Sequence, residues 1–139
     1  MKLRALVYSS KGKLHTLASD LVIKYASDVA NSYDKIPPAY SCNKERLVII
    51  AASVSKTIDT ALERFCKELT SERANNVAFI IDGPAEGAEA IKKITANAGA
   101  NVIDEVLFIK GGLPFLKGVK PEEKQAAYAW VDRVTAKMV

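Results

Sequence analysis

Four short apolar runs alternate with segments of helical period, and this alternation restricts the fold more than any other feature. The runs 2–8, 46–54, 76–83 and 101–112 are almost continuously apolar, which is typical of strands buried on both faces of a parallel sheet. The segments that follow them repeat apolar residues at the spacing of an amphipathic helix. We therefore expect an α/β fold in which helices cover both faces of a mostly parallel sheet.

The helical segments have clear stripes and ends. The first and clearest stripe consists of Leu14, Leu17, Ala18, Leu21, Val22, Tyr25, Ala26 and Val29. Two further stripes run from Ile58 to Leu69 and from Ala88 to Ala98, and Gly99 follows the latter as a natural C-cap. The closing helix has Pro121 in its first turn, followed by two glutamates at the positive end of the helix dipole. The sequence therefore predicts four helices.

A short edge strand completes the predicted sheet. The segment 31–45 is rich in turn residues, and Pro37-Pro38 limits any strand there to an edge. No repeat or linker interrupts the order β-α-β-β-α-β-α-β-α, so a single domain, 1–139, is expected. Five strands in a chain of this length favour a three-layer, doubly wound sheet in the order 2-1-3-4-5. Ligands then bind where the first and third strands meet.

Charge and hydropathy exclude several partners. The net charge is +4, but the lysines are scattered, and no dense basic run interleaved with aromatics marks a nucleic-acid surface. The longest apolar runs, such as 47–54, are too short to span a bilayer, and the first residues make a poor signal peptide. We therefore expect a cytoplasmic protein with neither a membrane nor a nucleic-acid partner.

The remaining chemistry-bearing residues give little sign of a catalytic centre. Cys42 and Cys66 lie far apart and form no CxxC pair, so two free, partly buried thiols are expected. His15 is the single histidine, which argues against a metal site, and it is expected to be exposed or to cap a helix. Trp130 lies on a helical stripe and is predicted to be core. The segment 110–118 is predicted to be a packed surface loop, although it could also close over a ligand or form a partner patch.

The turn after the first strand combines groups that hold phosphate. It lies at the carboxyl edge of the predicted sheet, where the unpaired N–H groups of a helix N-terminus carry positive partial charge. Its serines add hydroxyl donors, its lysines add charge, and its glycine lets the backbone approach closely. The candidate residues are Ser9, Ser10, Lys11, Gly12, Lys13 and Leu14. The other interpretation is a tight turn in which a serine caps the helix.

The stretch 6–18, LVYSSKGKLHTLA, resembles the flavodoxin signature. In that signature an apolar strand leads into a Ser/Thr-x-Thr-Gly-Asn-Thr loop, and an alanine follows four residues into the helix. Ser9 and Ser10 match the first hydroxyl positions, Gly12 matches the glycine, and Ala18 matches the alanine. The resemblance implies a flavodoxin-like fold that binds FMN, with the phosphate held in this turn.

The resemblance also implies two loops beside the flavin ring, after the third and fourth strands. Their candidate residues are Ser53, Val54 and Ser55 in the 53–56 loop, and Asp82, Gly83 and Pro84 in the 82–85 loop. Plain strand-to-helix connections are the other interpretation of both loops. Neither loop contains an aromatic residue, whereas flavodoxins usually stack the ring on aromatics there.

Two functions remain open. The first is a flavodoxin-like FMN protein, a monomer or weak homodimer, that passes electrons to a redox partner protein or assists a flavoenzyme. The alternative is a flavodoxin-fold binding or regulatory module that has lost FMN. The turn keeps its length, serines and glycine, which favours the first. Lys11, Lys13 and Leu14 stand where the family usually has threonine, asparagine and threonine, and together with the missing aromatics this favours the second.

Overall fold

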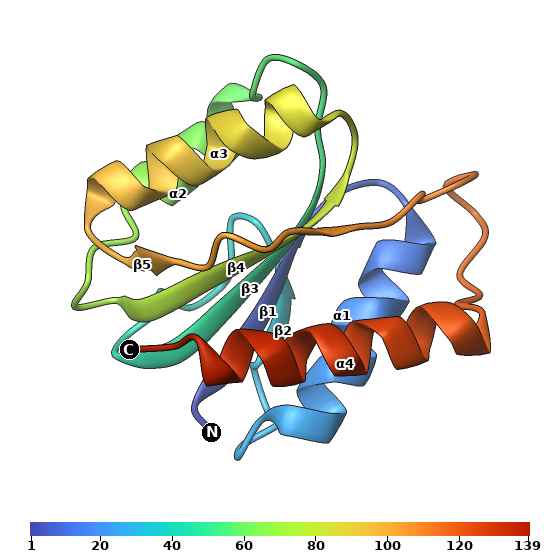
Figure 1. Cartoon of the computed structure of the whole chain (residues 1–139), viewed down its shortest axis with the longest axis horizontal. Coiled ribbons are helices and arrows are strands. Elements are labelled where there is room, and N and C mark those ends of the chain that lie inside the picture. The colour runs from blue at the N-terminus through green and yellow to red at the C-terminus, as the bar shows by residue number, and fades with distance from the viewer.

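The sheet is parallel throughout and has helices on both faces (Figure 1). The computed structural model describes residues 1–139. The strands are β1 (Leu3–Tyr8), β2 (Tyr33–Lys35), β3 (Glu45–Ser53), β4 (Ala74–Asp82), β5 (Asn101–Val102) and β6 (Leu107–Phe108). The helices are α1 (Gly12–Tyr25), α2 (Thr60–Lys67), α3 (Ala85–Ala98) and α4 (Pro121–Ala136).

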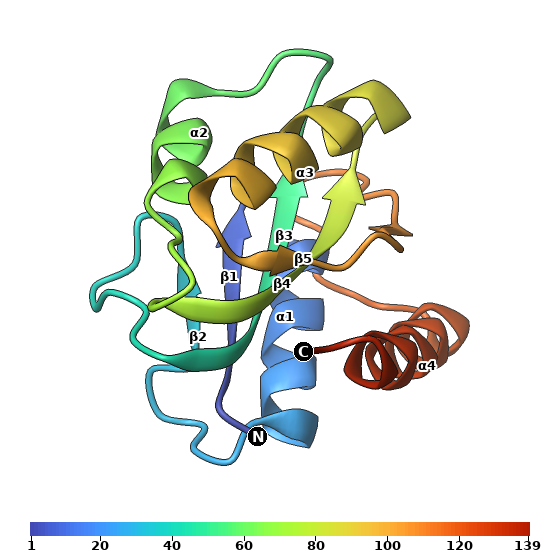
Figure 2. The same cartoon turned by 60° about the vertical axis from the view of Figure 1, so that its left-hand side comes forward.

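The strand order agrees with a doubly wound sheet. It runs β2-β1-β3-β4-β5, and β6 also pairs with β4. The predicted α/β class and parallel sheet are therefore confirmed. The helices α1 and α4 cover one face, while α2 and α3 cover the other (Figure 2). Trp130 is fully buried between α4 and the sheet, so its predicted core position is confirmed.

The prediction of one last strand over 101–112 was wrong. Val77 of β4 pairs with Val102, and Ile80 of β4 pairs with Leu107. The chain therefore advances three residues along β4 but five residues from β5 to β6. The two extra residues loop out of the sheet between β5 and β6. The indole N–H of Trp130 donates to the Glu105 carbonyl at 2.9 Å, which holds this outward loop against α4. The backbone at Glu105, which the sequence pattern assigned to a strand, therefore bonds the last helix and not a neighbouring strand.

Helix α1 begins and ends earlier than its apolar stripe predicts. It starts at Gly12 and ends at Tyr25, and Ala26 already has an extended backbone. The chain turns there because the Ala5 N–H donates to the Ser32 carbonyl, which brings β2 alongside β1. Val29 belongs to the predicted stripe but is 50% exposed, so that part of the prediction was wrong.

Both cysteines are free, as predicted, but both are buried rather than only partly buried. Burial raises the pKa of Cys42 and raises that of Cys66 to about 12. Because the thiolate is the reactive form of cysteine, both side chains act as small apolar core residues.

Glu123 joins the first turn of α4 to α1. Its Oε2 accepts from Lys13 Nζ at 2.9 Å, and its Oε1 accepts from the Lys120 N–H at 3.0 Å. Burial alone raises the pKa of Glu123, but these hydrogen bonds and the two lysine charges outweigh burial and lower it. The ionised carboxylate therefore stabilises the docking of α4.

We expect Glu123→Gln to lower the free energy of unfolding at pH 7 by about 1–2 kcal/mol, because it removes a charged hydrogen bond and weakens the cap. A lowered folded-state pKa contributes stability that is present above the ordinary glutamate pKa of about 4.3 and is lost as pH falls through the folded value. Urea unfolding at pH 7 and pH 3 should show the difference from wild type shrinking at pH 3. Glu122→Gln, on the exposed neighbour, is the control. An equal loss at both pH values would contradict this assignment.

Candidate functional site

Three strand-to-helix connections meet at the carboxyl edge of the sheet (Figure 2). The strand ends are nearly level, because Tyr8 pairs with Ala52 and Ser53 pairs with Asp82. Between β1 and β3 the order of strands reverses, and ligands of open α/β sheets bind outside the carboxyl ends at such a point. The β1–α1, β3–α2 and β4–α3 loops therefore form the candidate site.

A chain of hydrogen bonds connects the three loops. The Lys11 N–H donates to Ser9 Oγ at 2.9 Å, Ser9 Oγ lies 2.7 Å from Ser53 Oγ, and Ser53 Oγ donates to Asp82 Oδ2 at 3.0 Å. Each hydroxyl has one proton. Since Ser53 donates to the carboxylate, Ser9 donates to Ser53. Both hydroxyl protons therefore point toward Asp82.

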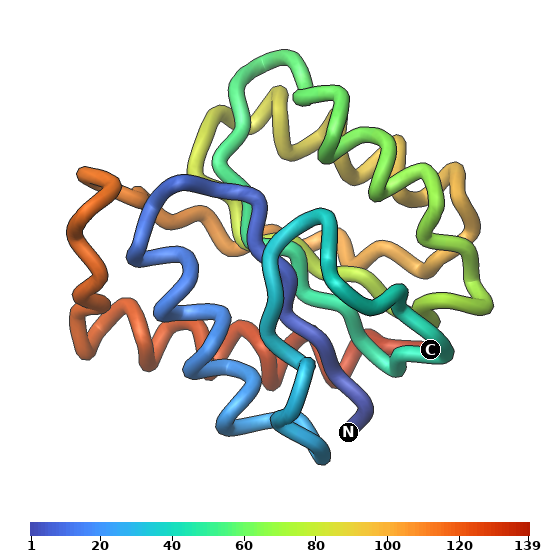
Figure 3. Tube along the Cα trace, turned by 180° about the vertical axis from the view of Figure 1, so that it is seen from behind, coloured from blue at the N-terminus to red at the C-terminus, as the bar shows by residue number.

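The loop 110–118 closes on the N-terminus of α1 (Figure 3). The Gly12 N–H donates to the Pro114 carbonyl at 3.0 Å, and Lys11 Nζ donates to the Gly112 carbonyl at 2.7 Å. A Cβ added to Gly12 would lie only 2.7 Å from Lys117 Cγ, so a glycine is required beneath this loop. Two donors of the candidate phosphate turn therefore bind backbone carbonyls of the same chain.

The other candidates of this turn lie in different surroundings. Ser10 is exposed, whereas Lys13 points to Glu123 of α4. Leu14 is fully buried in the core beneath α1, so its side chain does not reach the site. No serine caps the helix by accepting from its first turn: Lys11 is the N-cap residue, and Ser9 accepts from its N–H.

Two hollows flank the candidate site. One of about 410 Å³ lies between the β3–α2 and β4–α3 loops and brings together five of the six predicted ring-side residues, Ser53, Val54, Ser55, Asp82 and Gly83. Pro84 stands next to it as the N-cap residue of α3. The other hollow, of about 550 Å³, lies over the first turn of α1 between Ser10 and Pro114. The tertiary structure therefore separates a ring-side hollow from a turn-side hollow.

Further residues at this edge were not marked as site residues by the sequence. His15 Nε2 lies 2.9 Å from the Ser9 carbonyl, and its Nδ1 bonds the hydroxyl of Tyr33 from β2. Tyr8 donates to the Asp59 carboxylate at 3.1 Å. Burial raises the pKa of Tyr8, and the hydrogen bond to Asp59 adds to this rise. These pairs join residues 18 and 51 positions apart, so no local motif could identify them.

Four apolar side chains are exposed at the end of β6 and in the loop that follows it. Phe108, Leu113 and Leu116 are each about half exposed, and Phe115 is 73% exposed. The loop 110–118 was predicted to pack on the surface. Its backbone does contact α1, but its large apolar side chains face solvent. They include, beside the candidate site, aromatic side chains of the kind that the 53–56 and 82–85 loops lack.

No family model, curated protein or solved structure matches this chain. The resemblance to flavodoxins therefore remains a prediction from the 6–18 stretch. No group of three or more His, Cys, Asp or Glu side chains is placed to hold a metal ion. None of the helices is both long enough and apolar enough to cross a membrane.

We expect Gly111→Ala to detach the loop 110–118. A Cβ at this position would lie 2.6 Å from Asp82 Oδ2 and 2.7 Å from Lys11 Cγ, so overpacking should cost about 1–3 kcal/mol. Urea unfolding measures the loss, and faster hydrogen exchange at the Gly12 N–H reports that the loop has lifted. Gly118→Ala is the matched control, because no heavy atom lies within 4 Å of its added Cβ. Equal effects of the two variants would contradict the close contact at Gly111.

Proposed function

We propose that this chain is a flavodoxin-like protein that binds FMN at the carboxyl edge and transfers electrons to a partner or assists a flavoenzyme. One observation carries the proposal. The reversal point of the sheet gathers the phosphate-type turn and both predicted ring-side loops around the N-terminus of α1. When bound, the flavin would supply the redox chemistry, and the protein would supply binding and electrostatics.

The turn would hold the phosphate through groups that now bind the 110–118 loop. The Gly12 N–H and the Lys11 ammonium are donors of the kind a phosphate needs, and the exposed Ser10 hydroxyl is a third. Their present acceptors are neutral carbonyls. For the neutral Gly12 N–H, a hydrogen bond to a charged oxygen is roughly twice as strong as one to a carbonyl, and the Lys11 ammonium would exchange a neutral acceptor for an anion, so a phosphate can displace Pro114 and Gly112. In this proposal the loop and the phosphate compete for the same donors.

The ring would enter the hollow of about 410 Å³ between the 53–56 and 82–85 loops. This volume lies within the usual range for small-molecule pockets. Val54 and Leu62 supply apolar walls, and the Asp59 and Asp82 carboxylates also line the hollow. Their negative charge would oppose added negative charge on a bound flavin and so would lower its reduction potential.

A second function rests on a different observation. The Pro114 carbonyl already accepts from the Gly12 N–H, and Lys117 packs over Gly12, as expected if the chain itself had replaced the phosphate. This supports a flavodoxin-fold module that has lost FMN and serves a binding or regulatory role. The exposed side chains of Phe108, Leu113 and Phe115 would then contact a protein partner.

Titration with FMN, followed by quenching of flavin fluorescence, tests the first function. We expect saturable binding at micromolar or tighter affinity, with riboflavin bound more weakly because it lacks the phosphate. Lys11→Gln should weaken FMN binding by about 10- to 100-fold, since a charged hydrogen bond contributes about 1.5–3 kcal/mol. The same variant should leave riboflavin binding unchanged.

Lys93→Gln is the matched control, because Lys93 is an exposed lysine on α3, away from the turn. It removes one positive charge and should change neither affinity. Absence of quenching up to high micromolar FMN would contradict the first function and favour the module without FMN. Equal affinity for FMN and riboflavin would contradict the phosphate role of the turn.

A further inference from the structure

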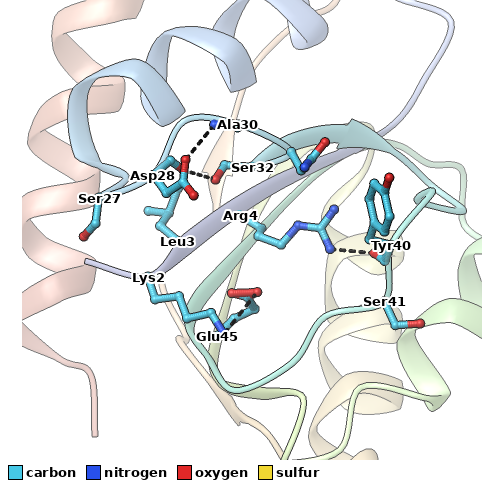
Figure 4. Close-up of a pocket in the computed structure, with 11 residues that line it drawn as sticks. Lys2, Leu3, Arg4, Ser27, Asp28, Ala30, Ser32, Tyr40, Ser41 and Glu45 are labelled. Carbon is cyan, nitrogen blue, oxygen red and sulfur yellow. Dashed lines mark hydrogen bonds and ion pairs between the residues drawn. The ribbon is translucent and has the colours of Figure 1, made fainter.

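A separate polar hollow of about 260 Å³ lies at the amino edge of the sheet (Figure 4). It is bounded by the start of β1, the chain that follows α1, and the connection from β2 to β3. Its lining is mostly polar and includes Lys2, Arg4, Asp28, Ser41 and Glu45. Because β1 separates it from the turn at Ser9, this hollow is distinct from the candidate FMN site.

Arg4 is buried beneath this hollow with only 5% of its surface exposed. Alternation along β1 sends Leu3 and Ala5 into the core under α1 and α4, so Arg4 faces the opposite side of the sheet. No helix covers β1 there, because the chain between β2 and β3 forms none. The segment 36–44 lies over it instead, and Ile36 and Cys42 are buried there with Leu6. A guanidinium does not lose its proton, so Arg4 is a buried positive charge.

Two of the three guanidinium nitrogens have no partner. Nη1 donates to the Tyr40 carbonyl at 2.7 Å and lies 3.8 Å from Cys42 Sγ. Nε and Nη2 are buried without any hydrogen-bond partner. No carboxylate forms an ion pair with Arg4: the nearest ion-pair partner of Glu45 is Lys2 Nζ at 3.9 Å, and Asp34 accepts from backbone N–H groups. An unpaired buried charge lowers the free energy of unfolding. This indicates that Nε and Nη2 serve a partner that the fold itself does not supply.

Asp34 is near enough to sense this charge but is engaged elsewhere. Burial raises the pKa of its carboxyl, but the N–H groups of Ala39 and Lys35 and the charge of Arg4 outweigh burial and lower it. The charge of Arg4 therefore acts on the Asp34 carboxyl from a distance, and no anion is bonded to Arg4 to neutralise it.

The geometry points to a binding site for the carboxylate of a small hydroxy or amino monocarboxylic acid, and we propose that Arg4 holds it. Nε–H and Nη2–H lie on one edge of the planar guanidinium, where they form two parallel donors that match a carboxylate. The hollow is smaller than a typical drug-sized pocket, so the ligand is small. Asp28 and Glu45 also line it, and these carboxylates accept from a hydroxyl or amino group but repel a second negative charge.

Binding requires a small movement of the covering segment. Both free nitrogens are covered in the present structure, so in this proposal the segment 36–44, which forms neither helix nor strand, shifts to uncover them. Tyr40, whose carbonyl binds Arg4, has a side chain that is 63% exposed at the rim of the hollow. A bound carboxylate would be shielded from water, which strengthens its pairing with the guanidinium.

Ligand-dependent stability tests the site. Thermal unfolding is followed with sodium glycolate, glycine and sodium malonate at constant ionic strength, with sodium chloride as the reference. We expect a saturable rise in Tm with glycolate and glycine, because a ligand bound only by the folded state stabilises it. Malonate should give a smaller rise. No saturable rise with either monocarboxylate would overturn the proposal.

Variants separate a binding role from a structural one. Arg4→Met should abolish the rise in Tm without lowering Tm in chloride, since it replaces an unpaired buried charge with an apolar side chain of similar length. Arg64→Met, on an exposed arginine of α2, should keep the full rise. Should Arg4→Met fail to fold, Arg4→Lys keeps the charge without the paired donors and should weaken binding at least 10-fold. A rise that persists unchanged in the Arg4 variants would overturn the proposal.

Side-chain NMR gives a direct measurement on the unmodified protein. The Nε–H resonance of Arg4 should shift saturably with glycolate, at the concentrations that raise Tm, while that of Arg64 should not. A Tm rise without any shift at Arg4 would place the ligand elsewhere and overturn the assignment.

Discussion

The in-register pairing of β1, β3 and β4 is the constraint on which the rest of the structure depends. These strands are buried on both faces, so helices must cover both faces and the connections must meet at the edges of the sheet. Because Ser53 pairs directly with Asp82, two loops 29 residues apart begin side by side and share a hydrogen bond. The candidate site is therefore a consequence of strand register before any ligand is considered.

The N-terminus of α1 is where the fold and the proposed function compete for the same atoms. The buried N–H of Gly12 must find an acceptor, and the ammonium of the neighbouring Lys11 is a second donor. In the present structure the carbonyls of Gly112 and Pro114 provide them, which ties the chain after β6 to the start of α1. That chain continues into α4, whose Glu123 pairs with Lys13 of α1. A ligand at the turn would therefore act on the loop that connects the sheet to the last helix.

The two edges of the sheet differ in how their polar groups are satisfied. At the carboxyl edge Ser9, Ser53 and Asp82 bond one another, and the donors at the start of α1 bond the carbonyls of Gly112 and Pro114. At the amino edge Arg4 keeps two buried donors without partners. The difference follows from the connection between β2 and β3, which is too short and too rich in proline to form a helix over β1. The irregular segment 36–44 covers Arg4 there, and its Tyr40 carbonyl accepts from only one of the three guanidinium nitrogens.

The sequence by itself determined the layered α/β arrangement, since apolar runs and helical stripes are local patterns that report which faces are buried. It also identified the edge strand through Pro37-Pro38, the buried Trp130, and the loops that meet at the carboxyl edge. Only the tertiary structure decided three contacts. Trp130 bonds the Glu105 carbonyl between β5 and β6, Lys13 pairs with Glu123, and the Gly12 N–H donates to the Pro114 carbonyl. Each of these is a contact between residues 25 or more positions apart, and periodicity within a window of a dozen residues carries no information about such partners. The unpaired Arg4 is the extreme case, because an arginine in an apolar run is visible in the sequence but its missing partner is not.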